Sequence, residues 1–449
     1  MREFRRGDGL KQKNHLMSTF RRKRKGRGAA MGGSKLEIGV IGLGQRGAAY
    51  GMTDGSIGLL GNILNNSDVL VTAVCDSRED RVNFAAEKVV KAGQGEPLKT
   101  TDYNAVLQSG VDAVIVSTSW ASHVIVALAA MEKGVAVAIE VGGTHNLGDM
   151  RKLVETYEKT KTPFMFLENC CYNKDELLVT SLARNGKLGE ICYCHGAYCH
   201  DLRNEITEVG LKRGHYRLEE YKNHNCENYP THELGPIIKL LGITRGNKFT
   251  SLTASASKAR GLEEYINTHE EVAALKGTNF KQGDVVTTSI QCENGELITL
   301  KLDTTLPRLY DREITVSGTK GYYNQTLKAV ILDGEKFDHE KDSIQSALNS
   351  QDDYEEYLPE DWKTITEEQL KSGHGGMDYI MLKHFFRAVA NKEEMPIDVY
   401  EACAMMCVTA LSEQSIANGG APVEVPDFTN GKYRERQIVD VLPLPRIGK

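Results

Sequence analysis

A glycine-rich turn directly after a short apolar run constrains the fold of this chain more than any other feature. Residues 35–47 read KLEIGVIGLGQRG, in which the apolar run predicts a buried strand and Gly42, Gly44 and Gly47 form a G-x-G-x-x-G pattern. The first glycine allows a tight turn, the second leaves room for a pyrophosphate, and the third lets a helix pack closely. The helix start, with Gln45 and Arg46, would offer backbone N–H groups to the phosphates.

A second predicted strand supports a dinucleotide-binding turn. Residues 69–75 are apolar and end in Asp76, and an acid at this place can bind the ribose hydroxyls. The interval from Gly47 is longer than usual, because residues 51–66 form an insertion rich in Gly and Asn. A glycine-rich turn that binds no ligand is the alternative interpretation.

Predicted helices and strands continue to alternate through the N-terminal part of the chain. The further helices are 81–92, 124–133 and 149–160, and the further strands are 112–117, 135–140 and 163–167. This alternation predicts an α/β fold, with a doubly wound sheet of about six parallel strands in a dinucleotide-binding domain at residues 35–170. Ser119, Trp120 and His123 follow the third strand and Glu140 closes the next. We therefore expect these four residues at the edge where the nucleotide binds, although Glu140 could be a solvated loop acid and His123 a helix-start residue.

The remaining residues have a different pattern. Predicted strands are 190–198, 250–257, 285–293, 296–303 and 313–317, and predicted helices are 175–185, 231–241, 378–390 and 400–418. Turn residues between successive strands, such as Asn294-Gly295, indicate a mostly antiparallel sheet with helices over one face. We predict a C-terminal α+β domain at residues 171–449 that binds the substrate. Residues 336–372 are polar and acidic and are expected to form a surface excursion.

Charge is distributed unevenly along the 449 residues. Residues 1–34 hold eleven Lys and Arg against two acids, a net charge of +9, so that the other residues carry −15 of the total of −6. An acidic body argues against nucleic acid as the main partner. The basic segment predicts a disordered tail, with a patch for nucleic acid or an anionic surface as the alternative.

No targeting or spanning segment is visible in the sequence. No apolar run approaches the ~18 residues that a membrane helix needs. The basic tail lacks the apolar stretch of about 7–15 residues found in a secretory signal. Together with ten cysteines that form no dense framework, these features predict a cytoplasmic protein with free thiols. The sequence leaves open whether the chain forms a homo-oligomer.

One group of cysteines and histidines, at residues 192–200, raises the question of a metal. The segment reads CYCHGAYCH and has the character of a strand. Side chains alternate along a strand, so Cys192 and Cys194 should face away from His195 and Cys199. We therefore predict strand residues and no metal site, with metal binding as the alternative.

A dinucleotide domain followed by such a sheet resembles the Gfo/Idh/MocA oxidoreductases. Members of that superfamily usually carry E-K-P where this chain has Glu140, Val141 and Gly142, so the lysine used there for hydride chemistry is absent. A closer resemblance is to glycoside hydrolase family 109, over about residues 36–433. The motifs that carry it are NCCY at 169–172, HDLR at 200–203, NYPTH at 228–232, SKARGL at 257–262, QGDVVTT at 282–288, GHGGMDY at 373–379 and PDFTNGK at 426–432.

This resemblance implies an NAD-dependent α-N-acetylgalactosaminidase acting on a small glycoside or a glycan terminus. It implies catalytic roles for Tyr229 and His232 and places Asn169 and His374 beside the cofactor. The sugar-binding residues that it implies are Glu140, Tyr172, Arg217 and Tyr310. The chain departs from the family where Glu233 stands in place of a common glycine, in the loop TLPRLY before Tyr310, and in the short segment between Arg203 and Arg217.

The family chemistry implied is a redox-assisted hydrolysis, an exception to the usual pair of carboxylates. NAD takes a hydride from C3 of the sugar, a base removes the C2 hydrogen, the anomeric group leaves, water adds, and the hydride returns. Tyr229 and His232 lie three residues apart at the entry to a helix, and either could be the C2 base. A packed tyrosine and a core histidine are the structural alternatives. Two other functions stay open: a sugar dehydrogenase that releases NADH, and a non-catalytic NAD sensor.

Overall fold

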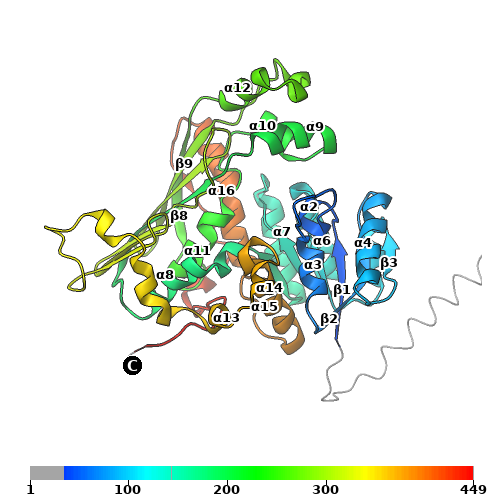
Figure 1. Ribbon diagram of the computed structural model, residues 1–449, viewed down its shortest axis with the longest axis horizontal. Helices are drawn as coiled ribbons and strands as arrows, with labels where there is room; N and C mark the ends of the chain where they lie inside the picture. Colours follow the sequence, from blue (N-terminus) through cyan, green and yellow to red (C-terminus); the bar gives the residue numbers. More distant parts are fainter. Residues whose placement is uncertain (1–34, 143, 448–449) are drawn as a thin grey trace, which may run out of the picture.

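Two β-sheets organise the molecule (Figure 1). The computed structural model describes residues 35–142 and 144–447, so the predicted disordered tail at residues 1–34 lies outside the described residues. The N-terminal sheet and its helices, in blue and cyan, lie on the right of Figure 1, and the larger sheet lies on the left. The domain boundary at residue 170 stays a prediction.

The first sheet has six parallel strands in the order β3-β2-β1-β4-β5-β6. They are β1 (Leu36–Ile41), β2 (Val69–Cys75), β3 (Leu98–Thr100), β4 (Ala113–Val116), β5 (Ala136–Glu140) and β6 (Phe164–Leu167). Strands β4, β5 and β6 are buried along their whole length because helices cover both faces, which explains their unbroken apolar sequence. The strand order reverses between β1 and β4, where nucleotides bind in such folds. The predicted doubly wound sheet is confirmed, and only the short, exposed β3 was missed.

The helices of this half are mostly where the sequence predicts them. They are α2 (Gln45–Ala48), α3 (Gly58–Leu64), α4 (Glu79–Lys91), α5 (Tyr103–Gln108), α6 (Trp120–Glu132) and α7 (Leu147–Thr160). The helix after the glycine turn is a single turn, since Ala49 adopts a left-handed conformation with φ of 56°. The insertion at residues 51–66 supplies α3 in its place. Helix α6 also begins four residues earlier than predicted, because extended Ser119 precedes it.

The second sheet has eight strands in the order β13-β12-β11-β7-β10-β9-β8-β14. They are β7 (Ile191–Cys199), β8 (Phe249–Ala256), β9 (Val285–Cys292), β10 (Leu297–Asp303), β11 (Thr315–Gly318), β12 (Gly321–Asn324), β13 (Ala329–Leu332) and β14 (Val423–Glu424). In the described chain, β7 and β10 pair in parallel and the other neighbours are antiparallel, which confirms the mostly antiparallel prediction. Burial alternates along β9 and β10, as expected when one face packs and the other meets solvent.

Helices connect the two sheets. The longer ones are α8 (Lys174–Arg184), α10 (Arg217–Asn223), α11 (Thr231–Leu241), α12 (Gly261–Thr268), α15 (Met377–Asn391) and α16 (Val399–Ala417). The shorter α-helices are α9 (Gly210–Arg213), α13 (Glu360–Lys363) and α14 (Glu367–Leu370), and the other short turns are η2 (Asn169–Tyr172), η3 (Glu205–Val209), η4 (Glu270–Leu275), η5 (Ile344–Ala347), η6 (Ser350–Tyr357), η7 (His374–Gly376) and η8 (Lys432–Arg434). Helix α16 packs on β8 of the large sheet and on α7 and β6 of the small one. Asp398 caps its N-terminus through the backbone N–H groups of Tyr400 and Glu401.

The predicted surface excursion at residues 336–372 is partly wrong. Tyr357 and Leu358 are buried, and the Trp362 indole donates a hydrogen bond of 2.9 Å to the carbonyl of Tyr172. Apolar residues spaced within this acidic stretch therefore fix it to the body of the molecule.

The cysteines and the strand at residues 192–200 agree with the sequence analysis. All ten cysteines are free, and only Cys192 among them is exposed. His195 and Cys199 both contact Glu313, whereas Cys194 lies on the opposite, buried face of β7. Within the described residues, no helix has the length and apolar character needed to cross a membrane.

Candidate active site

The glycine loop after β1 has the form of a phosphate cradle. A Cβ on Gly42, whose φ is 91°, would lie 2.5 Å from the backbone of Ser117, and one on Gly47 would collide with the carbonyl oxygen of Gly42. Gly44 differs, because its Cβ would enter open space, with Arg81 Nη1 at 3.7 Å as the nearest atom. The fold itself requires the first and third glycines, while the bare backbone at Gly44 fits a ligand. The loop thus has the form expected for binding a dinucleotide pyrophosphate.

Asp76 lies where the ribose is expected, at the end of β2. Its carboxylate accepts a hydrogen bond of 2.7 Å from the backbone N–H of Leu43 and one of 3.0 Å from that of Arg78. The Asp76 side chain is almost completely buried. Its hydrogen bonds hold the glycine loop, at the edge of the sheet where the nucleotide is expected. Its contact with the ribose remains a prediction.

His123 has a structural position. It is 4% exposed, and its Nε2 lies 2.9 Å from the carbonyl oxygen of Thr118. Burial lowers its pKa to about 4, so the imidazole is neutral and donates this bond. The prediction that His123 contacts the cofactor is not supported by this orientation, and the helix-start alternative describes it better. Ser119 stays at the sheet edge, with its hydroxyl 3.2 Å from that of Ser122.

An aromatic group surrounds a buried arginine at the start of α10. The indole of Trp120 lies 4.7 Å from the ring of Tyr216 and stacks at 5.8 Å on that of Tyr229. The Arg217 guanidinium lies over both Trp120 and Tyr229, at 5.2 and 4.8 Å, and its Nε is 2.9 Å from Glu205. The Nη1 of Arg217 is buried and has no hydrogen-bond partner among the described residues. A buried donor of this kind can bind a hydroxyl or an amide oxygen of a ligand.

Three residues beside this group form a chain for moving a proton. The Tyr229 hydroxyl lies 3.4 Å from Nε2 of His232, and Nδ1 of His232 lies 2.8 and 3.0 Å from the two oxygens of Glu168. Burial alone would raise the pKa of the Glu168 carboxyl, but its interaction with His232 and the hydrogen bond from the backbone N–H of Cys170 hold it below its ordinary value. Glu168 therefore stays ionised, accepts the Nδ1 proton and turns Nε2 toward Tyr229.

Glu168 was not among the predicted site residues. It directly follows β6, as Asp76 follows β2 and as Glu140 ends β5. The same rule of acids at the carboxyl edge of a parallel sheet would have found it.

Tyr310 approaches the site from the large sheet. Its ring lies 5.2 Å from that of His200 and 6.2 Å from that of Tyr198, which in turn lies 4.5 Å from Tyr229. The Tyr310 hydroxyl accepts a hydrogen bond of 3.1 Å from Arg312, and the residue is 47% exposed. Tyr310 thus forms the open rim of the cluster.

Three predicted residues, Arg46, Asn169 and His374, meet at a carboxylate that the sequence analysis did not single out, Asp378 of α15. Arg46 pairs with both oxygens of Asp378 and donates a bond of 2.8 Å from Nε to Glu140. Asn169 Nδ2 and His374 Nδ1 each lie 2.9 Å from Asp378. Burial opposes ionisation, but Arg46 and His374 keep the pKa of Asp378 well below its ordinary value. The side chains of Arg46 and Glu140 thus hold each other in place, although both were predicted to contact ligands.

Gly142 explains the departure from E-K-P after β5. Its φ of 154° is accompanied by close approach of the Trp120 indole, which a Cβ at this position would strike. Any larger residue there would displace the aromatic group.

Tyr172 is not brought into the cluster. Its side chain is completely buried, its ring lies 6.4 Å from that of His384, and its hydroxyl has no hydrogen-bond partner among the described residues. The Tyr172 ring thus has no exposed surface here, and its contact with a sugar remains a prediction.

Two further carboxyls are buried beside α11. Glu227 and Glu233 are fully enclosed, and none of their four oxygens has a hydrogen-bond partner within the described residues. Burial raises the pKa of both, and the charge of Glu227 adds to the effect on Glu233. Glu233 packs over Gly196 of β7. A Cβ added at Gly196 would lie 2.7 Å from the Cβ of Glu233. This pair of acids next to His232 is a feature that the Y-P-T-H motif alone did not predict.

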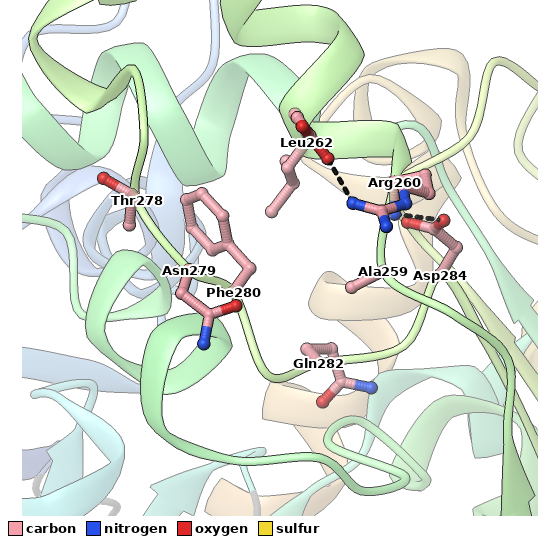
Figure 2. A pocket seen from close by; sticks show the side chains of 9 residues that line it. Ala259, Arg260, Leu262, Thr278, Asn279, Phe280, Gln282 and Asp284 are labelled. Carbon is pink, nitrogen blue, oxygen red and sulfur yellow. Dashed lines mark hydrogen bonds and ion pairs between the residues drawn. The ribbon is translucent and has the colours of Figure 1, made fainter.

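The motif at residues 282–288 supports the active-site loop from behind. The side-chain amide of Gln282 accepts a hydrogen bond of 3.2 Å from Cys226 N–H and donates one of 2.9 Å to its carbonyl. Asp284 accepts bonds from the N–H groups of Arg260 and Gly261 at the start of α12. Figure 2 shows Phe280, Gln282 and Asp284 around a small pocket. Gln282 and Asp284 hold the loops on either side of it, including the one that ends in Tyr229.

The comparisons with known proteins agree with this arrangement. Residues 172–435 match the family described as glycosyl hydrolase 109, C-terminal domain. The chain belongs to glycoside hydrolase family 109. Residues 36–167 match the NAD-binding Rossmann fold of the Gfo/Idh/MocA oxidoreductase family. NAD is therefore the cofactor of this family 109 glycoside hydrolase, and the predicted family and cofactor are confirmed.

Two curated relatives span most of the chain. A glycosyl hydrolase family 109 protein of Stenotrophomonas maltophilia is 37% identical over 437 residues, covering 91% of this chain and 92% of its own length. An α-N-acetylgalactosaminidase of Tannerella forsythia is 32% identical over 429 residues, covering 90% of this chain and 88% of its own length. Among solved structures, a levoglucosan dehydrogenase in complex with NADH and levoglucosan has a TM-score of 0.64 at 16% identity, covering 88% of this chain and 100% of its own. That likeness shows the fold.

Proposed function

We propose that this family 109 enzyme is a retaining, NAD-dependent glycosidase that removes terminal α-N-acetylgalactosamine. The observation that carries the proposal is the Glu168–His232–Tyr229 chain beside the aromatic group around Arg217. The name of the Tannerella forsythia relative supports the choice of sugar. When bound, NAD supplies the transient oxidation at C3 of the sugar and its later reversal.

The chain assigns different parts to its two candidate catalytic residues. Burial, and next the neighbouring Tyr198, raise the pKa of Tyr229 well above its ordinary value, so its phenol stays protonated. Tyr229 is then a hydrogen-bond donor to a sugar oxygen. His232 has its Nδ1 proton held by Glu168, and the lone pair on Nε2 takes the proton from C2. Glu168 balances the positive charge that His232 gains in this step.

The carboxylates at the sheet edge argue against the ordinary two-carboxylate mechanism. Glu140 and Asp378 both pair with Arg46, and Glu168 accepts the proton of His232. A displacement mechanism needs one acid and one free carboxylate across the glycosidic bond. These three acids hold partners of their own, which favours the route through C2.

The sugar dehydrogenase alternative is less well supported. Val141 occupies the place of the lysine of E-K-P and is buried, and Trp120 lies against Gly142. In this chain the space next to the end of β5 therefore holds an apolar and aromatic group where a dehydrogenase would hold a cationic proton carrier.

The proposal is tested by hydrolysis of aryl N-acetyl-α-galactosaminide in heavy water. We expect the released sugar to carry deuterium at C2 and the solution to accumulate no net NADH. Product that keeps its hydrogen at C2 would contradict the redox route, and NADH formed in step with free sugar would favour a dehydrogenase. A panel of other aryl glycosides, including α-galactoside and N-acetyl-α-glucosaminide, tests the choice of sugar in the same assay.

A further inference from the structure

A cluster of two histidines and two glutamates lies outside the proposed active site. His145 follows β5 in the loop before α7, Glu220 and His224 lie on and at the end of α10, and Glu413 lies on α16. The imidazole rings of His145 and His224 stack with their centroids 3.6 Å apart. Three separate segments therefore bring four metal-ligating side chains to one place.

The hydrogen bonds give both rings the same orientation. Nδ1 of His145 lies 3.0 Å from one oxygen of Glu413, and Nδ1 of His224 lies 2.9 Å from the other. On the opposite side, Glu220 Oε2 lies 3.0 Å from Nε2 of His145 and 4.0 Å from Nε2 of His224. A carboxylate that accepts the Nδ1 proton is the usual outer partner of a metal-binding histidine. Nε2 then faces Glu220 in both rings, and an ion bound between them would take the place of the hydrogen bond between Nε2 of His145 and Glu220.

We propose that His145, His224 and Glu220 bind a divalent transition-metal ion, with Glu413 as the outer carboxylate that orients both rings. One ligand atom from each of the three residues lies within 4.8 Å of the others, so small side-chain rotations bring them around a common centre. Two imidazoles and one carboxylate suit Zn²⁺ and its first-row neighbours, whereas Mg²⁺ prefers oxygen ligands alone. The four side chains are 21–32% exposed, so an ion can reach them from solvent.

The position of this cluster indicates what the ion does. Arg217 begins α10, and Glu220 lies one turn further along the same helix. A metal bound here would fasten α10 to the loop after β5 and to α16. It would thereby hold Arg217 against Trp120 and Tyr229, so we assign it a positioning role.

The second group with metal-ligating atoms, Glu168, Cys170 and His232, is less suitable. Cys170 is buried and burial raises its pKa well above the ordinary value, so it is held as a thiol, not the thiolate that binds metal. His232 already uses Nδ1 toward Glu168, and its Nε2 faces Tyr229. This group provides a control for the experiment.

The test uses tag-free, chelator-treated full chain, titrated with Zn²⁺ by calorimetry and with Co²⁺ by its visible absorption. We expect one equivalent to bind, with a rise in melting temperature, and no comparable effect of Mg²⁺. His224→Gln should abolish this binding, and Glu413→Gln should weaken it by about 10–100-fold as an outer-carboxylate change does. His269→Gln, which alters a half-buried histidine stacked on Tyr265, should bind as the wild type does.

Three results would overturn the proposal. They are no Zn²⁺ binding by the wild type, unchanged binding by His224→Gln, and loss of binding in His232→Gln with retention in His224→Gln. Circular dichroism of each variant establishes that it is folded. If His224→Gln does not fold, Glu220→Gln takes its place with the same expected loss, because it removes a ligand while keeping the shape of the side chain.

Discussion

At the scale of single residues, His232 depends on neighbours that lie far away in the sequence. Glu168 is 64 positions earlier and is completely buried, and it accepts the Nδ1 proton of His232. Tyr229, one helical turn before, faces the other nitrogen. An imidazole held in this way has one fixed tautomer, with the Nε2 lone pair beside the Tyr229 hydroxyl. The proposed role as base for a carbon acid requires such a lone pair.

The first prediction concerns this chain of residues. His232→Gln and Tyr229→Phe should each lower turnover by about 10²–10⁴-fold, the usual contribution of a general acid or base. Glu168→Gln should lower turnover as well and shift the pH profile of kcat, because the amide cannot stabilise the imidazolium. Steady-state hydrolysis of the aryl glycoside measures all three.

The matched controls are His269→Gln and Tyr433→Phe, which alter a histidine and a tyrosine outside the cluster. Both should keep turnover within about twofold of the wild type, in the manner of ordinary surface or structural changes. If the active-site variants behaved like these controls, Tyr229 and His232 would have structural roles only.

A second prediction follows from the buried pair Glu227 and Glu233. Their raised pKa values mean that the folded protein binds protons more tightly than the unfolded chain. This contribution to stability is present at low pH and is lost as the pH rises through the raised values. Glu233→Gln removes one titrating group, so its melting temperature relative to the wild type should be higher at about pH 8 than at about pH 5.

The control for this measurement is Glu264→Gln, on the exposed face of α12. Its melting temperature relative to the wild type should not change with pH. If the melting temperatures of Glu233→Gln and the wild type differed by the same amount at both pH values, Glu233 would be ionised in the folded protein.

At the scale of elements, the glycine loop separates the needs of the fold from those of the ligand. Gly47→Ala places a methyl group against the carbonyl of Gly42 and should prevent normal folding. Gly44→Ala places it in open space, and the φ of −74° at this position suits alanine. We therefore expect Gly44→Ala to fold with a melting temperature near that of the wild type while its NAD affinity falls by about tenfold or more.

Calorimetric titration with NAD and a thermal melt of the same samples measure the two effects separately. A Gly44→Ala variant that binds NAD normally would mean that the pyrophosphate does not cross this glycine. A variant that fails to fold would mean that Gly44 also has a packing role.

The sequence predicts most elements of this fold because their signals are local. The glycine turn, the apolar run of β2 and the amphipathic helix at 231–241 each need only neighbouring residues for their prediction. The short strands β12, β13 and β14 have two to four residues and little alternation, so no local pattern marks them. The early end of α2 could not be predicted, because the left-handed residue that ends it is Ala49 and not a glycine.

The candidate site could be predicted in part for the same reason. Tyr229 and His232 share one motif, and their proximity follows from helical spacing. Asp378 could not be paired with Arg46 from the sequence, since 332 positions separate them. The burial of Tyr172 likewise depends on α15, a helix from the other end of the chain.

At the scale of the whole molecule, the contacts of Asp378 join the two sheets. Arg46 follows the glycine loop of the first sheet, while Asp378 lies on α15 and also binds Asn169 at the end of the first domain. Helix α16 adds an apolar junction, since it packs on β8, α7 and β6. Other ionic contacts also cross between these parts, at His145 with Glu220 and Glu413 and at Glu158 with Lys432. Ionic and apolar contacts therefore hold the two parts together.

The last prediction tests the ionic contact by a double-mutant cycle. Asp378 is 1% exposed in its side chain and Arg46 is 28% exposed, so the pair is largely shielded from water. Asp378→Asn leaves the arginine without its main counter-charge and should lower the free energy of unfolding by about 3 kcal/mol. Arg46→Met should cost a similar amount, because a carboxylate is then left buried.

The double variant should lose at least about 1 kcal/mol less than the sum of the two, since neither charge is stranded. Urea unfolding measures each value. The control is Arg78→Met with Asp80→Asn, an ion pair of 2.7 Å with both partners nearly half exposed, for which we expect little coupling. Strict additivity at Arg46 and Asp378 would show that this ion pair contributes no coupling energy to the junction between the two sheets.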